Sequence, residues 1–365
     1  MKVFEDDNFR ILPLYFDLIS KEKVISFSYQ GFSVDYINQI IAEIKQSREQ
    51  NKILAIDMQF MSLLGNKTNG GIGLFEPIRE LLNEYCFIFY NIQEYPQILD
   101  LILSDLKLDE ESINYYNMIT FDRISSKDSN INWGAYIFSN EMVRQKIQDY
   151  NIIYKLRDIY TSEVSALLKE VCIDNKIQYL PSSDIYSDTY IRIKDLFMYP
   201  STISLSIFLL CKMIKDVFSK IRFDSIVSMS NTGAVIASLV GKMLDKDVLF
   251  CTNIGPKFAL DIDEIGKKIK KGYNYLYVYD FVCLGTEIKN LKSILTCFGA
   301  NVVGGVGVAS LPDFDLLRLH DAESQEGKSI LTNSYSLITL NKHGISYNIA
   351  TNEKELEEKL IEINR

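Results

Sequence analysis

Residues 275–290, YLYVYDFVCLGTEIKN, carry the clearest structural signal in this chain. The first five residues are apolar or aromatic, which predicts a buried strand running into the acid Asp280. A turn containing Gly285 follows, and the next residues have the spacing of a helix over 286–297. A strand that ends on an acid and passes through such a turn into a helix is typical of phosphate and ribose sites in α/β proteins.

Strands and helices alternate on both sides of this stretch. DSIVSMSNTGAVIASLVGKML predicts strand, turn and helix, and DVLFCTNI and ANVVGGVGVAS predict further strands. This alternation predicts a parallel sheet flanked by helices, with ligands at the carboxyl ends of its strands. The candidate ligand-binding residues at two such ends are Ser230, Asn231, Thr232, Gly233, Asp280, Gly285, Thr286 and Glu287.

The first part of the chain alternates in the same way. Strands are predicted at 24–29, 52–58 and 86–92, with helices at 33–49 and 74–84. A polar stretch with the single tryptophan, Trp133, separates this part from the rest. We therefore predict an α/β protein with two α/β domains: residues 1–110, a linker region at 111–150, and a second domain at 151–365.

The bulk composition excludes several classes of function. The chain has 365 residues, is 47% hydrophobic and carries a net charge of −9, which disfavours broad binding to nucleic acid or anionic membranes. No apolar run reaches the roughly 18 residues of a membrane span, and the start lacks a signal peptide. The six cysteines form no C-x-x-C pair and are interpreted as reduced thiols, which predicts a cytoplasmic protein.

The chain contains few histidines that could bind a metal or act in catalysis. The only two histidines are His320 and His343, so neither a histidine metal site nor a Ser-His triad is expected. We predict no resident metal, and the residues alone assign no catalytic group.

Residues of about 155–315 resemble type I phosphoribosyltransferases, most closely the orotate phosphoribosyltransferases. IRFDSIVSMSNTGAVIASLVGKMLDKDVLFCTNIGPKF is similar to the family's pyrophosphate loop with its flanking elements. YLYVYDFVCLGTEIKNLKSILTCFGANVVGGVGVA is similar to the phosphoribosyl-diphosphate motif and the strand after it. The resemblance implies a parallel-sheet domain, a small phosphorylated ligand (a nucleotide or phosphoribosyl diphosphate), Mg²⁺ if phosphoribosyl diphosphate is bound, and a homodimer.

The motif departs from the family pattern at the ribose and phosphate positions. Tyr279 replaces the first of two adjacent acids, so that only Asp280 remains. Cys283 and Leu284 replace a threonine pair, and Glu287 places a carboxylate where a threonine would face the phosphate. Like charges in a small site repel unless a cation or a proton intervenes.

This chain also has fewer of the basic residues that the family carries at its site. Pro181-Ser182-Ser183 stands where the family has Lys-Ser-Gly, and only Lys257 remains of an Arg-Lys pair. FALDIDEIGKKIKKG represents the mobile catalytic loop, and its lysines have no assigned role. Because departing pyrophosphate needs positive charge, the ordinary transfer is expected to be absent or greatly slowed.

Residues of about 10–110 are similar to STAS domains, which implies a role in binding a protein partner. Ser62 lies near the regulatory serine of those domains. Three readings of the whole chain stay open. The first is a ligand-sensing or partner-binding regulatory protein with reduced or absent transferase activity. The second is an active, Mg²⁺-dependent phosphoribosyltransferase acting on an orotate-like or other base, and the third is a scaffold with a closed site.

Overall fold

The computed structural model divides the chain into two compact units, Met1–Tyr160 and Thr161–Arg365. It describes residues 161–180, 184–251, 262–311 and 333–363 and, in the first unit, the strands together with Ala42 and Gln46. This division differs from the predicted one, because two strands of the first unit's sheet lie within the predicted linker. These strands are β7 (Met118–Ile119) and β8 (Ala135–Phe138). The polar composition of residues 111–150 predicted a linker, but such a composition does not exclude short apolar strands within the segment.

The first unit contains a six-stranded sheet in the order β1-β2-β5-β6-β8-β7. The central strands β2, β5 and β6 are parallel, as an α/β domain requires, and β8 pairs antiparallel with β6. A separate pair joins β3 and β4. Of the predicted helices, only Ala42 and Gln46 of 33–49 are described, and both are helical. Ser62 and Trp133 lie outside the described residues, and the STAS likeness stays a prediction. The remaining strand bounds are Phe4–Glu5 (β1), Phe9–Pro13 (β2), Ser20–Lys21 (β3), Val24–Ile25 (β4), Ile53–Asp57 (β5) and Phe87–Tyr90 (β6).

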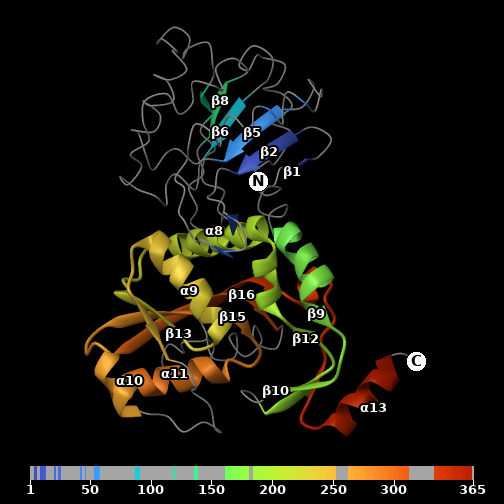
Figure 1. The fold of residues 1–365 in the computed structure, drawn as a ribbon, viewed down its shortest axis with the longest axis vertical. Helices are drawn as coiled ribbons and strands as arrows, with labels where there is room; N and C mark the ends of the chain where they lie inside the picture. Colours follow the sequence, from blue (N-terminus) through green and yellow to red (C-terminus); the bar gives the residue numbers. More distant parts are fainter. Residues whose placement is uncertain are drawn as a thin grey trace. The chain divides into compact units, whose positions relative to one another are not determined.

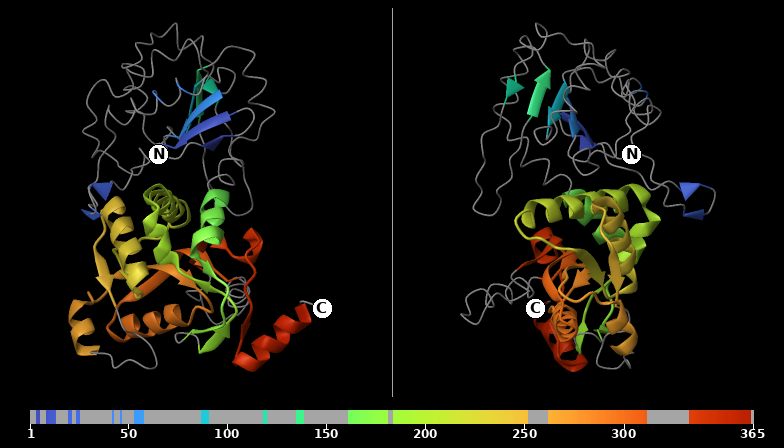
Figure 2. Two further views of the ribbon diagram at one scale, coloured as in Figure 1. Left: turned by 45° about the vertical axis from the view of Figure 1, so that its right-hand side comes forward. Right: turned by 90° about the vertical axis from the view of Figure 1, so that its left-hand side faces the viewer.

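The second unit is built on a five-stranded parallel sheet in the order β14-β13-β15-β16-β17. Figures 1 and 2 show α8 and α9 on one face of this sheet and α10 and α11 on the other. The predicted parallel sheet with helices on both faces is therefore confirmed. The strands are Ser225–Ser228 (β13), Val248–Phe250 (β14), Asn274–Val282 (β15), Asn301–Ser310 (β16) and Ser334–Thr339 (β17). The helices are Pro200–Val217 (α8), Asn231–Leu244 (α9), Ile262–Lys268 (α10) and Thr286–Cys297 (α11).

Alternation along β15 divides its side chains between the two faces of the sheet. Tyr275, Tyr277 and Tyr279 share one buried cluster with the apolar stripe of α11, which consists of Ile288, Leu291 and Leu295. Leu276 and Val278 are buried on the opposite face. Each fully buried leucine or isoleucine in this arrangement contributes about 2 kcal/mol. The carboxyl end of β15 is thus fixed by packing on both sides.

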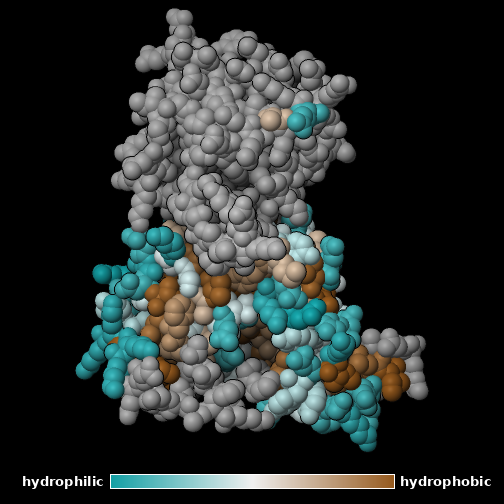
Figure 3. All heavy atoms as spheres, in the orientation of Figure 1, coloured by the Kyte–Doolittle hydropathy of each residue, from teal (hydrophilic) through white to brown (hydrophobic). Residues whose placement is uncertain are grey.

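The second unit also contains a smaller set of elements outside the five-stranded sheet. It contains a β10–β11 hairpin (Gln178–Leu180 and Ile185–Ser187), the short pair β9 (Ile173–Asp174) and β12 (Tyr190–Ile191), and η3 (Ile193–Met198). β18 (Ile349–Ala350) pairs with β11, and α13 (Glu353–Ile363) ends the described chain. Figure 3 shows both polar and apolar residues on the described part of this face, with apolar atoms visible over α13. None of the described helices is long and apolar enough to cross a membrane.

Candidate functional site

The order of the five strands places a topological switch point, here called the crevice, at the carboxyl ends of β13 and β15. Numbered along the chain, the strand order is 2-1-3-4-5, in which the first and third strands are neighbours. From β13 the chain continues into α9 on one face, and from β15 it continues into α11 on the other. Such a point of divergence is where ligands bind in open α/β sheets. The predicted residues at 230–233 and 280–287 lie at these two strand ends.

Ser230 begins α9 and occupies one of its free backbone donors. It is the N-cap residue, and its hydroxyl oxygen accepts a hydrogen bond from the backbone N–H of Gly233 over 2.9 Å. A Cβ at position 233 would lie 2.6 Å from the Ser230 hydroxyl and 2.8 Å from that of Ser228, so only glycine fits there. Asn231 is exposed and Thr232 is half-buried in the same first turn.

Asp280 joins the two strand ends. The Ser230 hydroxyl donates a hydrogen bond to Asp280 Oδ1 over 2.8 Å, which links the start of α9 to β15. Burial raises the pKa of Asp280, and the Ser230 hydroxyl and the backbone amides of Phe281 and Asp280 oppose that rise. The structure therefore brings Ser230 and Gly233 together with Asp280, as the sequence predicted for adjacent strand ends.

The turn after β15 places a carboxylate at the start of α11. Gly285 has a φ of +73°, a left-handed conformation that favours glycine, and it precedes the first helical residue, Thr286. Glu287 lies in the first turn of α11. Burial raises the pKa of Glu287, the negative charge of Asp280 raises it further, and the Tyr277 hydroxyl opposes both. The charge of Asp280 thus disfavours ionisation of Glu287.

Tyr277 reaches Glu287 from the middle of β15. Its hydroxyl donates a hydrogen bond to Glu287 Oε2 over 3.3 Å, and its side chain is only 1% exposed. Burial, the charge of Glu287 and the charge of Asp280 raise the pKa of Tyr277 well above its ordinary range, so this hydroxyl stays a donor. We name Asp280, Glu287 and Tyr277 the acidic cluster. Tyr277 was not among the predicted site residues, although the two-residue spacing of tyrosines in YLYVY places it on the same face of β15 as Tyr275 and Tyr279.

Tyr279 lies flat across β16 and extends to β17. Its side chain is 1% exposed, and its hydroxyl donates to the carbonyl oxygen of Tyr335 over 2.8 Å and contacts the Ser336 hydroxyl at 3.1 Å. Gly307 pairs with Tyr279 across the strands, and a Cβ at Gly307 would lie 1.9 Å from the ring. The residue that replaces the family's first acid is therefore a core residue that spans three strands.

The remaining sequence departures fall largely outside the described residues. Positions 181–183 and 252–261, which include Lys257, lie there. Of the segment that represents the mobile loop, the described part forms α10 and the turn before β15. Within the described ranges, no group of three or more His, Cys, Asp and Glu side chains is arranged to hold a metal ion.

The acidic cluster predicts a pH dependence of stability. Its folded carboxyls have pKa values raised above the ordinary 3.8 of Asp280 and 4.5 of Glu287, so the folded state binds protons more tightly than the unfolded chain. The free energy of unfolding should therefore fall as pH rises above those values. Glu287→Gln keeps an acceptor for Tyr277 and should stabilise the second unit by about 1 kcal/mol at pH 7, a gain that vanishes below about pH 4. Urea unfolding at pH 7 and below pH 4, monitored by amide exchange in β15 and β16, measures this change in the free energy of unfolding.

Glu355 supplies a control of opposite sign. The Thr351 hydroxyl and Lys359 lower its pKa, so its contribution is present above the ordinary value and is lost as pH falls. Glu355→Gln should therefore lower stability at pH 7. A Glu287→Gln protein with the native pH profile would contradict the repulsion between the two carboxyl groups.

Comparison with known proteins places this geometry in context. No protein-family model matches the sequence. The orotate phosphoribosyltransferase of Caldanaerobacter subterraneus is 25% identical over 142 residues, which are 39% of this chain and 71% of the relative; that of Thermoanaerobacter sp. gives the same figures. Among solved structures, the orotate phosphoribosyltransferase from Aeropyrum pernix is 17% identical with a TM-score of 0.36, covering 49% of this chain and 96% of its own. The UMP synthase of Leishmania donovani is 13% identical with a TM-score of 0.40, covering 81% and 67%.

The sequence similarity and the parallel five-stranded sheet together support a type I, orotate-phosphoribosyltransferase-like fold. The resemblance expected from the sequence is confirmed at this level. The STAS likeness of the first unit and the altered activity stay predictions.

Proposed function

We propose that this protein is a phosphoribosyltransferase-like regulatory protein that senses a ligand or binds a partner and has reduced or absent transferase activity. One observation carries the proposal: Ser230 caps the N-terminus of α9, and the first turn of α11, whose N-cap makes no side-chain hydrogen bond, contains an acidic residue. Ser230 accepts from Gly233 at α9, and the carboxylate of Glu287 lies in the first turn of α11. A helix start attracts phosphate through free N–H groups and its positive dipole end, and both attractions are weakened here.

The ribose side of the site supports the same proposal. Asp280 lies at the crevice and can accept hydrogen bonds from ribose hydroxyls. Tyr279, at the position of the other acid, is buried and bonded to β17, so it supplies no second carboxylate. The site therefore offers one ribose-binding acid in place of two.

The ligand we propose is a small phosphorylated molecule, a nucleotide or phosphoribosyl diphosphate. Mg²⁺ would accompany phosphoribosyl diphosphate. Asp280 would supply a carboxyl group toward such an ion, and oxygen atoms of the ligand would supply others. We also propose a cytoplasmic protein, a protein partner for the first unit and a homodimer, which follow from the resemblances.

Calorimetry on the full chain with phosphoribosyl diphosphate, nucleoside monophosphates and Mg²⁺ tests the proposal. Binding without pyrophosphate release supports it. Robust pyrophosphate release with any base would overturn it in favour of an active transferase, a reading that the retained Asp280 and Gly285 keep open. Absence of binding by every one of these ligands would overturn it in favour of a scaffold.

Glu287→Thr restores the family residue and gives a sharper result. Removal of the like charge should tighten the binding of phosphoribosyl diphosphate about tenfold, a difference of about 1.4 kcal/mol. Glu353→Thr is the matched control, because Glu353 is an exposed glutamate in the first turn of α13. Equal affinities for the native protein and Glu287→Thr would show that Glu287 does not face the phosphate.

A further inference from the structure

The segment 345–350, here called the C-terminal strap, is bound to the β10–β11 hairpin. β18 within the strap pairs antiparallel with β11, with Ala350 opposite Tyr186. Asn348 holds Asp188 through two bonds: its backbone N–H donates to Asp188 Oδ1 over 2.9 Å and its side-chain amide to Oδ2 over 2.7 Å. The backbone N–H of Asp188 donates in return to the Asn348 carbonyl over 3.1 Å. The strap and the hairpin therefore form one connected piece.

Tyr347 connects this piece to the turn between Asp280 and Gly285. Its side chain is 7% exposed, and its ring centroid lies 5.9 Å from that of Phe281 in a tilted arrangement. Burial raises the pKa of Tyr347, and Ser187 of β11, near its hydroxyl, opposes that rise. The Cys283 thiol is near enough to raise this pKa further. One buried aromatic side chain thus contacts both the hairpin and the turn.

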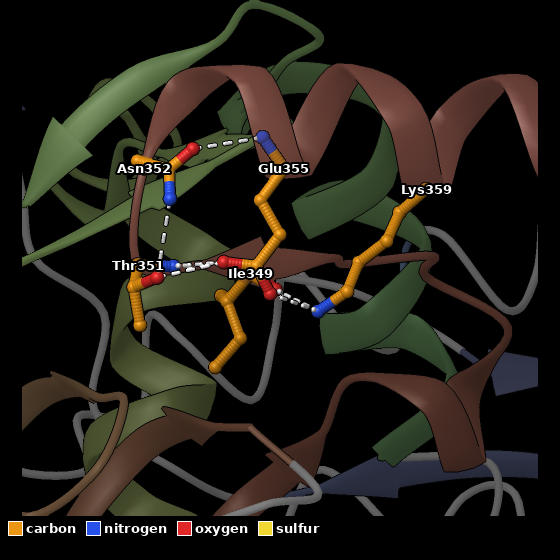
Figure 4. A network of polar contacts seen from close by, with 5 residues as sticks. All are labelled: Ile349, Thr351, Asn352, Glu355 and Lys359. Carbon is orange, nitrogen blue, oxygen red and sulfur yellow. Dashed lines mark hydrogen bonds and ion pairs between the residues drawn. The ribbon is translucent and has the colours of Figure 1, made fainter.

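Both ends of the strap are anchored. At its start, the backbone N–H of Ile345 donates to the carbonyl of Leu340, the residue after β17. After it, Lys359 of α13 donates to the carbonyl of Ile349 over 3.2 Å and pairs with Glu355 at 3.2 Å (Figure 4). Asn352 caps α13 by accepting from the backbone N–H of Glu355 over 2.9 Å. The preceding residue, Thr351, donates its hydroxyl to the Glu355 carboxylate over 2.7 Å.

We propose that Tyr347 is a positioning residue that fixes the turn 281–285 to the hairpin and so sets the conformation in which Asp280 and the start of α11 meet a ligand. The turn contains a left-handed glycine and connects β15 to α11, so its shape decides where Glu287 lies relative to Asp280. A turn without a buried packing partner opens locally more often than its flanking strand and helix. Displacement of the strap would therefore loosen the site while leaving the sheet intact. The part of the proposal that concerns ligand affinity rests on the proposed function.

Hydrogen exchange on the full chain without ligand tests the positioning role. Tyr347→Ala should raise exchange in a peptide covering 281–288 at least tenfold, because it removes the ring contact and its buried area. A peptide covering β13 should keep its native exchange. Tyr347→Phe keeps the ring and loses only the hydroxyl, so it should restore most of the protection. Native exchange of the turn in Tyr347→Ala, or a rise spread evenly over the sheet, would overturn the proposal.

Asn348→Ala covers the case in which Tyr347→Ala does not fold. This substitution removes the side-chain hydrogen bond to Asp188 and leaves the ring contact between Tyr347 and Phe281 in place. It should raise amide exchange of the same turn by a smaller factor than Tyr347→Ala does. Unchanged exchange of the turn in this variant, with exchange raised in the hairpin, would overturn the coupling.

Calorimetry then separates the two proposals. If native protein binds phosphoribosyl diphosphate, Tyr347→Ala should bind it more weakly and Tyr347→Phe nearly normally. If native protein does not bind it, the proposed function fails while the exchange result still decides the role of Tyr347.

Discussion

Tyr279→Asp, which restores the missing acid of the family motif, is expected to destabilise the second unit strongly rather than to revive a ribose site. The change removes a ring that is 1% exposed and lies over Gly305 and Gly307, and it leaves a void. It also buries a carboxylate and deprives the carbonyl of Tyr335 of its donor. Together these effects should cost about 4 kcal/mol, a large part of the stability of a domain this size.

Two measurements on the full chain separate this loss from damage elsewhere. Amide exchange in peptides of β15 and β16 reports on the second unit, and fluorescence of the single tryptophan, Trp133, reports on the first. Tyr279→Phe is the control: it keeps the ring and loses the hydroxyl bonds, so it should cost about 1 kcal/mol. A Tyr279→Asp protein with native exchange in β15 would show that the position tolerates an acid.

The secondary structure of the second unit could be predicted because its signals are local. The apolar run and the turn glycine placed β15 and its turn, and the spacing of Ile288, Leu291 and Leu295 predicted α11 over the residues it occupies. Both strand ends that carry the candidate site also lie where the alternation predicted. The boundary between the units could not be read in this way, because the pairing of β8 with β6 joins residues far apart in the sequence.

The chemistry of the site was predictable only in part. The sequence shows that a carboxylate replaces a threonine at position 287, but not that Tyr277 donates to it or that Ser230 already caps α9. Nor could it show where the Tyr279 ring lies, since that depends on glycines of the neighbouring strand. Side-chain directions of this kind depend on tertiary contacts, and they decide whether a strand-end residue faces a ligand or the core.

Gly307→Ala should destabilise the second unit by about 3 kcal/mol, although it adds a single methyl group. Its Cβ would lie 1.9 Å from Cδ2 and Cε2 of Tyr279, far inside van der Waals contact. The ring has little room to move, because its hydroxyl is bonded to Tyr335 and a Cβ at Gly305 would already lie 3.1 Å from the ring. The backbone cannot yield easily either, since β16 pairs with strands on both sides. Urea unfolding, monitored by amide exchange in β16, measures the loss of stability. Gly305→Ala, whose Cβ would make contacts of 3.1 Å or longer, should lose less stability.

A double-mutant cycle shows whether this loss comes from the ring. In a Tyr279→Ala protein the ring is gone, and the methyl group of Gly307→Ala enters the space it leaves. The second change should then cost little, which gives a coupling of about 2 kcal/mol between the two positions. Additive losses would place the cause in the β16 backbone instead. A strong coupling means that Tyr279 and Gly307 can only change together, so a return to an acid at position 279 also requires side chains on β16 that fill the volume of the ring.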